Sequence, residues 1–161
     1  METKVLVKRI ILEHIYLDRN IMNHIKNKLN KLKNSCNKKD GYIIDILSLD
    51  EIIDHEISRS CNENIFLIKF NANIFKPKVG MKIKSKICMI YSEGILCESF
   101  GKQKIFIPKN LMEEIYIFKQ NLNTCIYNGN NLNIDDTIIT EIKAVRFNNK
   151  QFNCVGMILK T

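Results

Sequence analysis

Three histidines are the side chains best suited to acid–base chemistry near neutral pH, and they are scattered along the chain. They are His14, His24 and His55, and each falls on a different expected element, so only the tertiary fold could bring them together. His55 lies between Asp54 and Glu56, but alternation along a strand directs those two carboxylates to the opposite face. No acid–base site is therefore expected from the histidines.

Two pairs of adjacent acids could in principle form a general acid–base couple. Asp135-Asp136 and Glu113-Glu114 are, however, typical of solvated turns and helix starts. The sequence contains no P-loop, no dinucleotide-binding glycine pattern and no G-x-S-x-G elbow, and only six residues are glycine. We expect a protein that is not an enzyme and that needs no cofactor.

The cysteines are the remaining candidates for chemistry, as metal ligands or nucleophiles. Six are present, but none forms a C-x-x-C pair and no His-x-x-x-His lies near them, so no metal site is expected. The N-terminus does not resemble a secretion signal, and no apolar run approaches the ~20 residues of a membrane span. We expect reduced thiols packed as small hydrophobic groups, and no membrane association.

Lysine dominates the charge of the chain. The formal net charge is +8, from 25 Lys and Arg against 17 Asp and Glu. Lysine, asparagine and isoleucine share A/T-rich codons, so part of this excess reflects codon bias. The placement of the lysines, rather than their number, therefore carries the information about partners.

The first half of the chain predicts an α+β unit of order β-α-β-β-β. Residues 4–12 are rich in β-branched and aliphatic residues, and residues 18–34, with Asp18 as the expected cap, carry one apolar stripe at helical spacing. Three further strands are expected, over residues 41–49, 51–57 and 64–75. The last of these has Phe66, Ile68 and Phe70 on one face, which indicates a sheet covered on one side by the helix.

The second half predicts an all-β barrel of the OB or S1 type. Short strands are expected at 80–90, 94–100, 103–107, 137–147 and 151–160, with a brief helical turn over 108–114. Residues 119–136 are expected to be a long polar loop. The domain boundaries follow: 1–76 for the N-terminal domain and 77–161 for the OB/S1-like barrel domain.

The junction between the two halves is marked by Pro77 and Gly80. Proline ends strand pairing, and glycine lets the chain turn into the first barrel strand. In that strand Lys82, Lys84 and Lys86 share one face. This row is either a solvated outer face or a track for a phosphate backbone, because OB barrels often bind single strands across such a face.

Three stretches of the sequence together resemble one protein family. They are KNSCNKKDGYIIDIL, KFNANIFKPKVGMKI and SEGILCESFGKQKIFIPKNLM. Their order and spacing resemble the larger stalk subunit of multisubunit DNA-dependent RNA polymerases. This is the seventh subunit of eukaryotic RNA polymerase II and the E subunit of the archaeal enzyme. The resemblance covers nearly the whole chain.

The resemblance implies a non-catalytic stalk subunit that functions in transcription. The N-terminal domain would dock near the polymerase clamp through loops at one end of its sheet, and the barrel would contact emerging RNA. The implied partners are the polymerase core subunits, a smaller helical stalk subunit packed along the domain junction, and single-stranded RNA. The candidate docking residues are Gly41, Tyr42, Asp54, Arg59 and Asn64.

The barrel departs from the S1 pattern at the positions where aromatic side chains stack on bases. Those positions correspond to Glu93, Leu96 and approximately Ile107, so RNA contact would depend on lysines, with possible help from Tyr91 or Phe106. Such binding would be weak, independent of sequence and strongly dependent on salt. The candidate RNA-binding residues are Lys82, Lys84, Lys86, Lys102, Lys104 and Lys109.

Two other functions remain open at this point. One is a free-standing S1/OB single-stranded RNA-binding factor in translation or RNA processing, which the missing aromatics disfavour. The other is an unrelated enzyme with an OB appendage, for which no site is found. The codon bias is compatible with a cellular or a viral source. The expected localisation is the nucleus for a cellular protein, and the cytoplasm or virion for a protein of a large DNA virus.

Overall fold

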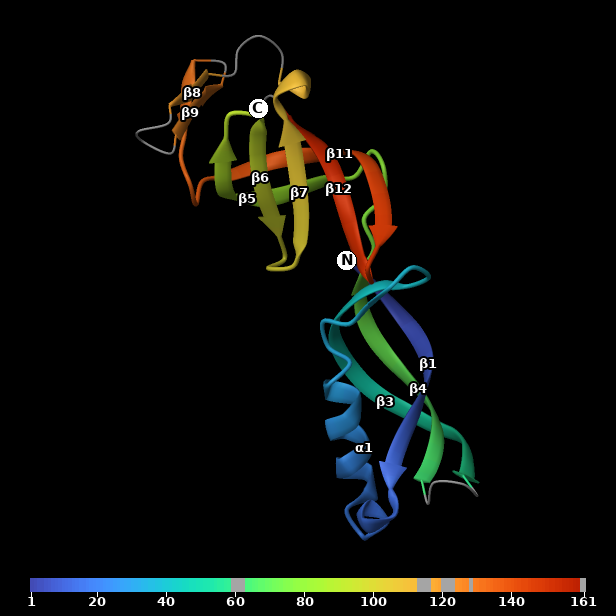
Figure 1. Cartoon of the computed structure of the whole chain (residues 1–161). Coiled ribbons are helices and arrows are strands. Elements are labelled where there is room, and N and C mark those ends of the chain that lie inside the picture. Colours follow the sequence, from blue (N-terminus) through green and yellow to red (C-terminus); the bar gives the residue numbers. More distant parts are fainter. Residues whose placement is uncertain (59–62, 113–116, 120–123, 128, 160–161) are drawn as a thin grey trace. The chain divides into compact units, whose positions relative to one another are not determined.

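The computed structural model describes residues 1–58, 63–112, 117–119, 124–127 and 129–159. The chain divides into two compact units, Met1–Lys76 and Pro77–Thr161, and each is considered by itself. Both units consist mainly of strands, with one α-helix in the described part of the chain (Figure 1).

The N-terminal unit is a four-stranded antiparallel sheet with one helix. The strand order is β1-β4-β3-β2. A 3-10 turn, His14–Tyr16, follows β1 and leads toward the helix. The elements are β1 (Glu2–Glu13), α1 (Ile21–Asn30), β2 (Cys36–Asn37), β3 (Gly41–Ser58) and β4 (Glu63–Phe75).

One face of this sheet packs against α1 and forms the core of the unit. Ile25 and Leu29 of the helix are buried against Leu6 and Ile10 of β1 and Phe70 of β4. Along β4 the even-numbered residues from 64 to 74 are buried and the odd-numbered ones are half-buried, as the sequence predicted for a sheet covered on one side. Figure 1 shows α1 beside β3.

The predicted arrangement of five elements in this unit is not confirmed in detail. The two strands expected at 41–49 and 51–57 are one strand, β3, and the short strand β2 was not expected. Four register shifts interrupt the pairing of β3 with β4, so Ile44, Leu47, Asp50 and Ile53 are extra residues without a partner on β4. The residues that pair with the buried positions of β4 therefore recur every three residues, from Ile43 to His55. Bulges of this kind bend a strand and increase its twist.

The helix is shorter than its apolar stripe predicted. It begins at Ile21, with Asn20 in the cap position, and Asp18 does not cap it. Instead the Asp18 carboxylate accepts a hydrogen bond from the backbone N–H of Asn20 at 2.7 Å. After Asn30 the chain continues as turns, in which Leu32 still packs against the core.

The C-terminal unit contains a closed five-stranded barrel, as predicted. Around the barrel the strands follow the order β11-β12-β7-β6-β5, with β11 also paired to β5 and with β12 parallel to β7. This topology is consistent with an OB fold. The strands are β5 (Lys82–Tyr91), β6 (Gly94–Ser99), β7 (Gln103–Pro108), β11 (Thr137–Asn148) and β12 (Gln151–Ile158).

The barrel interior combines apolar side chains with a few hydrogen-bonded polar ones. Ile87, Ile95 and Ile105 are among the fully buried side chains. The hydroxyls of Ser85 and Thr140 lie 2.7 Å apart and link β5 to β11 from inside. Such pairing is needed because a buried hydroxyl without a partner is costly.

Residues 119–136 are not simply the long polar loop that the sequence predicted. In the described residues they contribute to a three-stranded sheet of β8 (Ile117–Lys119), β9 (Thr124–Tyr127) and β10 (Asn130–Leu132). Cys125 in the middle strand is fully buried. The predicted helical turn over 108–114 is represented by a 3-10 turn, Lys109–Leu111, and residues 113–114 lie outside the described residues.

Candidate functional site

The outer face of strands β5, β6 and β7 carries the lysine row. Along β5, Ile83, Ser85 and Ile87 face inward and are buried, whereas Lys82, Lys84 and Lys86 are exposed. The alternation expected from the sequence is therefore present. It follows from the pleat of a strand with one face in a closed barrel.

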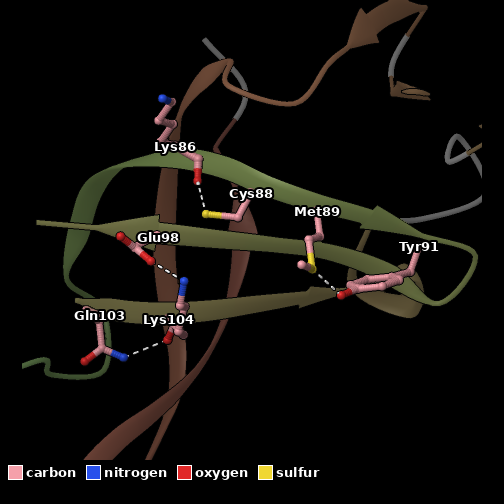
Figure 2. Close-up of polar contacts among 7 residues, drawn as sticks. All are labelled: Lys86, Cys88, Met89, Tyr91, Glu98, Gln103 and Lys104. Atoms are coloured by element: carbon pink, nitrogen blue, oxygen red, sulfur yellow. Dashed lines mark hydrogen bonds and ion pairs between the residues drawn. The ribbon is translucent and has the colours of Figure 1, made fainter. Parts of the chain in front are cut away.

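Two of the candidate RNA-binding lysines form ion pairs with neighbouring acids. Lys86 contacts Asp135 at 2.9 Å, and Lys104 on β7 contacts Glu98 on β6 (Figure 2). In each case the hydrogen bond to the carboxylate is the main cause that raises the pKa of the lysine. Both lysines are charged at neutral pH, but part of their field is cancelled locally.

The other four candidates are exposed and have no ion pair within the described part of the chain. Lys82 and Lys84 lie on β5, Lys102 in the turn between β6 and β7, and Lys109 in the 3-10 turn after β7. They are free to contact a phosphate backbone. The structure brings Lys86 and Lys104 onto one row of the barrel face, because each is paired in register with Glu98.

An apolar patch continues this face beyond the charged row. Leu96 on β6 is paired in register with Met89 on β5 and with Phe106 on β7. Met89 is 50% exposed and Tyr91 is 43% exposed, and the Tyr91 hydroxyl donates to the Met89 sulfur (Figure 2). One end of the barrel face is therefore cationic, and the other presents apolar and aromatic groups.

The S1-type stacking positions need one correction. Ile107, which the sequence placed near the strand-three position, is fully buried inside the barrel, and the outward neighbour is half-buried Phe106. Glu93 is exposed in the turn before β6, and Leu96 is half-buried. An aromatic ring is thus available on strand β7, one residue before the expected position.

Two of the candidate docking residues, Gly41 and Tyr42, are buried at the start of β3. Gly41 has φ +90°, and a Cβ there would overlap with the carbonyl oxygen of Phe75 and lie 2.8 Å from the Cβ of Lys76. Glycine is therefore required by the close approach of β4. Burial limits what either side chain can offer to a partner.

Two further docking candidates, Asp54 and Asn64, lie at the other end of the β3–β4 pair. Asp54 is exposed, whereas Asn64 is fully buried and its Oδ1 lies 3.0 Å from Nε2 of His55. The imidazole of His55 stacks on Phe66 with ring centroids 4.4 Å apart, so stacking and the contact with Asn64 account for this histidine without a catalytic role. Arg59 lies outside the described residues.

An ion pair between half-buried Lys4 and buried Asp40, next to Gly41, was not found from the sequence. Asp40 is 7% exposed, and its carboxylate accepts a hydrogen bond from Nζ of Lys4 at 2.8 Å. Desolvation alone would raise the pKa of Asp40, but the contact with Lys4, together with Asn37 and the charge of Lys8, outweighs it, and the pKa is lowered. This pair ties β1 to the loop that leads into β3, and only the fold brings the two residues together.

The remaining candidates for acid–base chemistry make ion pairs or hydrogen bonds that hold the local structure. His24 contacts Asp18, Asp135 binds Lys86, and the Asp136 carboxylate accepts a backbone N–H from Asn133. Among the described residues no three His, Cys, Asp or Glu side chains are placed to hold a metal ion. The helices in the described ranges are all too short or too polar to span a membrane.

The chain is similar over most of its length to one subunit of RNA polymerase II. DNA-directed RNA polymerase II subunit rpb7 of Dictyostelium discoideum is 25% identical over 132 residues, covering 80% of this chain and 76% of that protein. Subunit RPB7 of Glycine max is 22% identical over 158 residues, or 96% and 89%. Subunit 7 of Arabidopsis thaliana is 23% identical over 111 residues, or 68% and 62%. No family model matches the chain.

These relatives confirm the resemblance to the RPB7-like family that the three sequence stretches predicted. They also bear out the expectation that the chain is not itself an enzyme. The three relatives give no support to the viral alternative for localisation.

Proposed function

We propose that this relative of RPB7 is a non-catalytic stalk subunit of a DNA-directed RNA polymerase of the RNA polymerase II type, and that it acts in the nucleus. The observation that supports this most strongly is the extent of the similarity. The match to the Glycine max subunit covers 96% of the chain and therefore includes both the helix-bearing sheet and the barrel.

In this proposal the N-terminal unit docks on the polymerase core. The exposed end of β3 provides a surface for docking, because Asp54 and its neighbours Glu51 and Glu56 are acidic and exposed. Gly41 and Tyr42 shape the other end of the strand from within. A smaller helical stalk subunit is the proposed second partner.

The barrel contacts emerging RNA through the lysines of its outer face. Lys82 and Lys84 are exposed and form no ion pair within the described part of the barrel, so they carry more of this contact than Lys86 and Lys104. Phosphate contacts from lysines position a strand without reading its sequence. Phe106 and Tyr91 add the aromatic surface that sequence-tolerant stacking requires.

Affinity purification of the tagged chain from its native source tests the docking. Large polymerase subunits should be recovered in stoichiometric amounts, and Asp54→Lys should lower their recovery. The matched control is Glu2→Lys, which makes the same charge change at an exposed position of the same unit. Absence of every polymerase subunit with the unaltered chain would show that the proposal is wrong.

A binding titration tests the RNA contact separately. The double variant Lys82→Gln, Lys84→Gln should reduce the slope of log affinity for oligouridylate against log salt concentration by about 1.4. The control variant Lys78→Gln, Lys150→Gln, at two exposed lysines, should leave that slope unchanged. The free-standing RNA-binding alternative predicts tight binding by the chain alone at physiological salt, with no polymerase recovered.

A further inference from the structure

A second concentration of positive charge lies in the N-terminal unit, on α1 and the turns around it. Residues 19–39 contain seven lysines and arginines and no aspartate or glutamate. Among the described residues, only one of the seven takes part in an ion pair, Lys33 with Asp45 at 2.6 Å. The basic residues are Arg19, Lys26, Lys28, Lys31, Lys33, Lys38 and Lys39.

A small pocket opens beside this basic helix. Its lining comes from the end of β1, from the 3-10 turn and from one face of α1, and its volume is about 170 Å³. His24, Lys28 and Lys31 fall on one side of the helix because they are spaced by four and three residues. The lining residues are Leu12, Tyr16, His24, Asn27, Lys28 and Lys31.

Aromatic and imidazole rings form the wall of the pocket and are held in place by local contacts. The rings of Tyr16 and His24 lie 5.0 Å apart at 51°. Nε2 of His24 is 3.2 and 3.3 Å from the two carboxylate oxygens of Asp18, which fixes the orientation of the imidazole. Asp18 contacts His24 but is not itself among the lining residues, so no carboxylate lines the described part of the pocket.

The size and the polar groups of the pocket suit a phosphate group. Pockets for drug-sized ligands or cofactors measure about 300–1,000 Å³, so this one is too small for them. Lys28, Lys31, Asn27 and Tyr16 carry ammonium, amide and hydroxyl donors. These are the side-chain types that contact phosphate oxygens in nucleic-acid complexes.

We infer that the pocket beside α1 binds backbone phosphates of a nucleic acid, and that the basic face of the helix guides the strand toward it. This goes beyond the proposed function, which assigns RNA contact to the barrel alone. The interaction is electrostatic and independent of sequence. The flanking basic residues outside the pocket contribute field, whereas Lys28 and Lys31 contribute direct contacts.

An acidic polypeptide fits this surface less well than a nucleic acid does. Protein partners usually place apolar or aromatic anchors into pockets at the centre of an interface. Among the described residues that line the pocket, Leu12 is the one aliphatic side chain, and it is fully buried. The donors around the rim offer phosphate contacts but little apolar area.

Binding of a short labelled oligouridylate to the full chain tests the inference, read by fluorescence anisotropy over a range of salt. Lys28→Gln with Lys31→Gln should lower the affinity up to ~25-fold at about 0.1 M salt and reduce the salt slope by about 1.4, if each lysine makes one contact. The matched control is Lys38→Gln with Lys39→Gln, which removes the same charge from the same basic run outside the pocket. Tyr16→Phe, which removes only the hydroxyl, should weaken binding further at constant charge.

Three outcomes would overturn the inference. Equal losses in the Lys28/Lys31 pair and in the Lys38/Lys39 pair would show diffuse charge rather than a site. Displacement of the oligonucleotide by poly-glutamate at the same charge concentration would assign the surface to acidic polypeptides. The Lys28/Lys31 substitutions can also be made in a chain in which Lys82 and Lys84 are already neutralised. If they then no longer weaken binding, the barrel is the sole contact. If they weaken binding by the same factor as before, the inference is supported independently of the barrel.

Discussion

The replacement of Gly94 by alanine provides the sharpest test of the barrel geometry. Gly94 begins β6, pairs with Tyr91 and Pro108, and has φ +149°. A Cβ built there would overlap with the carbonyl oxygen of Ile107 and lie 2.9 Å from the Cα of Pro108. The contacted atoms belong to backbone, so relief requires β6 and β7 to separate at this end.

The expected cost follows from two contributions. An alanine in a backbone region that only glycine readily adopts costs ~1–3 kcal/mol. Separation of the strand ends disturbs hydrogen bonding worth ~1 kcal/mol. Together they predict that Gly94→Ala lowers the free energy of unfolding of the C-terminal unit by about 3 kcal/mol.

Gly80→Ala is the matched control in the same unit. Gly80 has φ +83°, but a Cβ there meets no atom within 4 Å, so only the backbone term of ~1–2 kcal/mol applies. Urea unfolding followed by circular dichroism measures both variants on the transition of the same unit. A difference of less than about 0.5 kcal/mol between them would refute the steric argument.

Three further predictions concern the charges and the thiols. Despite desolvation, the pKa of Asp40 is lowered, because Lys4, Asn37 and the charge of Lys8 favour the carboxylate. The ionised carboxylate therefore stabilises the fold above about pH 4, and this stabilisation is lost as the pH falls through the lowered pKa. Asp40→Asn should accordingly flatten the fall in Tm between about pH 5 and pH 3. Glu98→Gln releases Lys104 and should raise oligouridylate affinity up to ~5-fold in anisotropy titrations; unchanged affinity would argue against RNA contact at Lys104. Burial raises the pKa of Cys97 to about 12, so iodoacetamide at about pH 8 should alkylate half-buried Cys88 first and Cys97 only after unfolding, which peptide mass spectrometry resolves; equal rates would mean that the barrel opens readily.

The barrel strands could be predicted from the sequence because they obey the simple two-residue alternation. In β5 every second residue faces the interior, and turn residues such as Ser92-Glu93 and Asn149-Lys150 separate the strands. The lysine row followed from the same alternation. Closure of the barrel depends on pairing of β11 with β5 across more than forty intervening residues, and the sequence predicted it only indirectly, from the number and spacing of the short strands.

The N-terminal unit was harder to predict because β3 follows a different period. The residues of β3 that pair with buried positions of β4, Ile43, Ile46, Leu49 and Ile52, are three residues apart, since a bulge residue follows each of them. A search for two-residue alternation loses phase at Asp50 and divides the strand into two. Apolar residues at a constant spacing of three, without the spacings of four that a helical stripe also needs, are the signal that could have shown a repeatedly bulged strand.

The candidate site was predictable in its charges but not in how those charges are compensated. Lys86 lies 49 positions from Asp135, and Lys4 lies 36 positions from Asp40, so neither ion pair leaves a local pattern in the sequence. The consequence is functional, because a carboxylate beside a lysine cancels part of the field that attracts a phosphate. Equal lysine counts on two surfaces therefore do not imply equal affinity for a polyanion. Two of six candidates on the barrel are paired in this way, whereas Lys28 on α1 and Lys31 at its C-cap form no ion pair within the described residues, and this difference makes the helix, as well as the barrel, a place to look for nucleic acid.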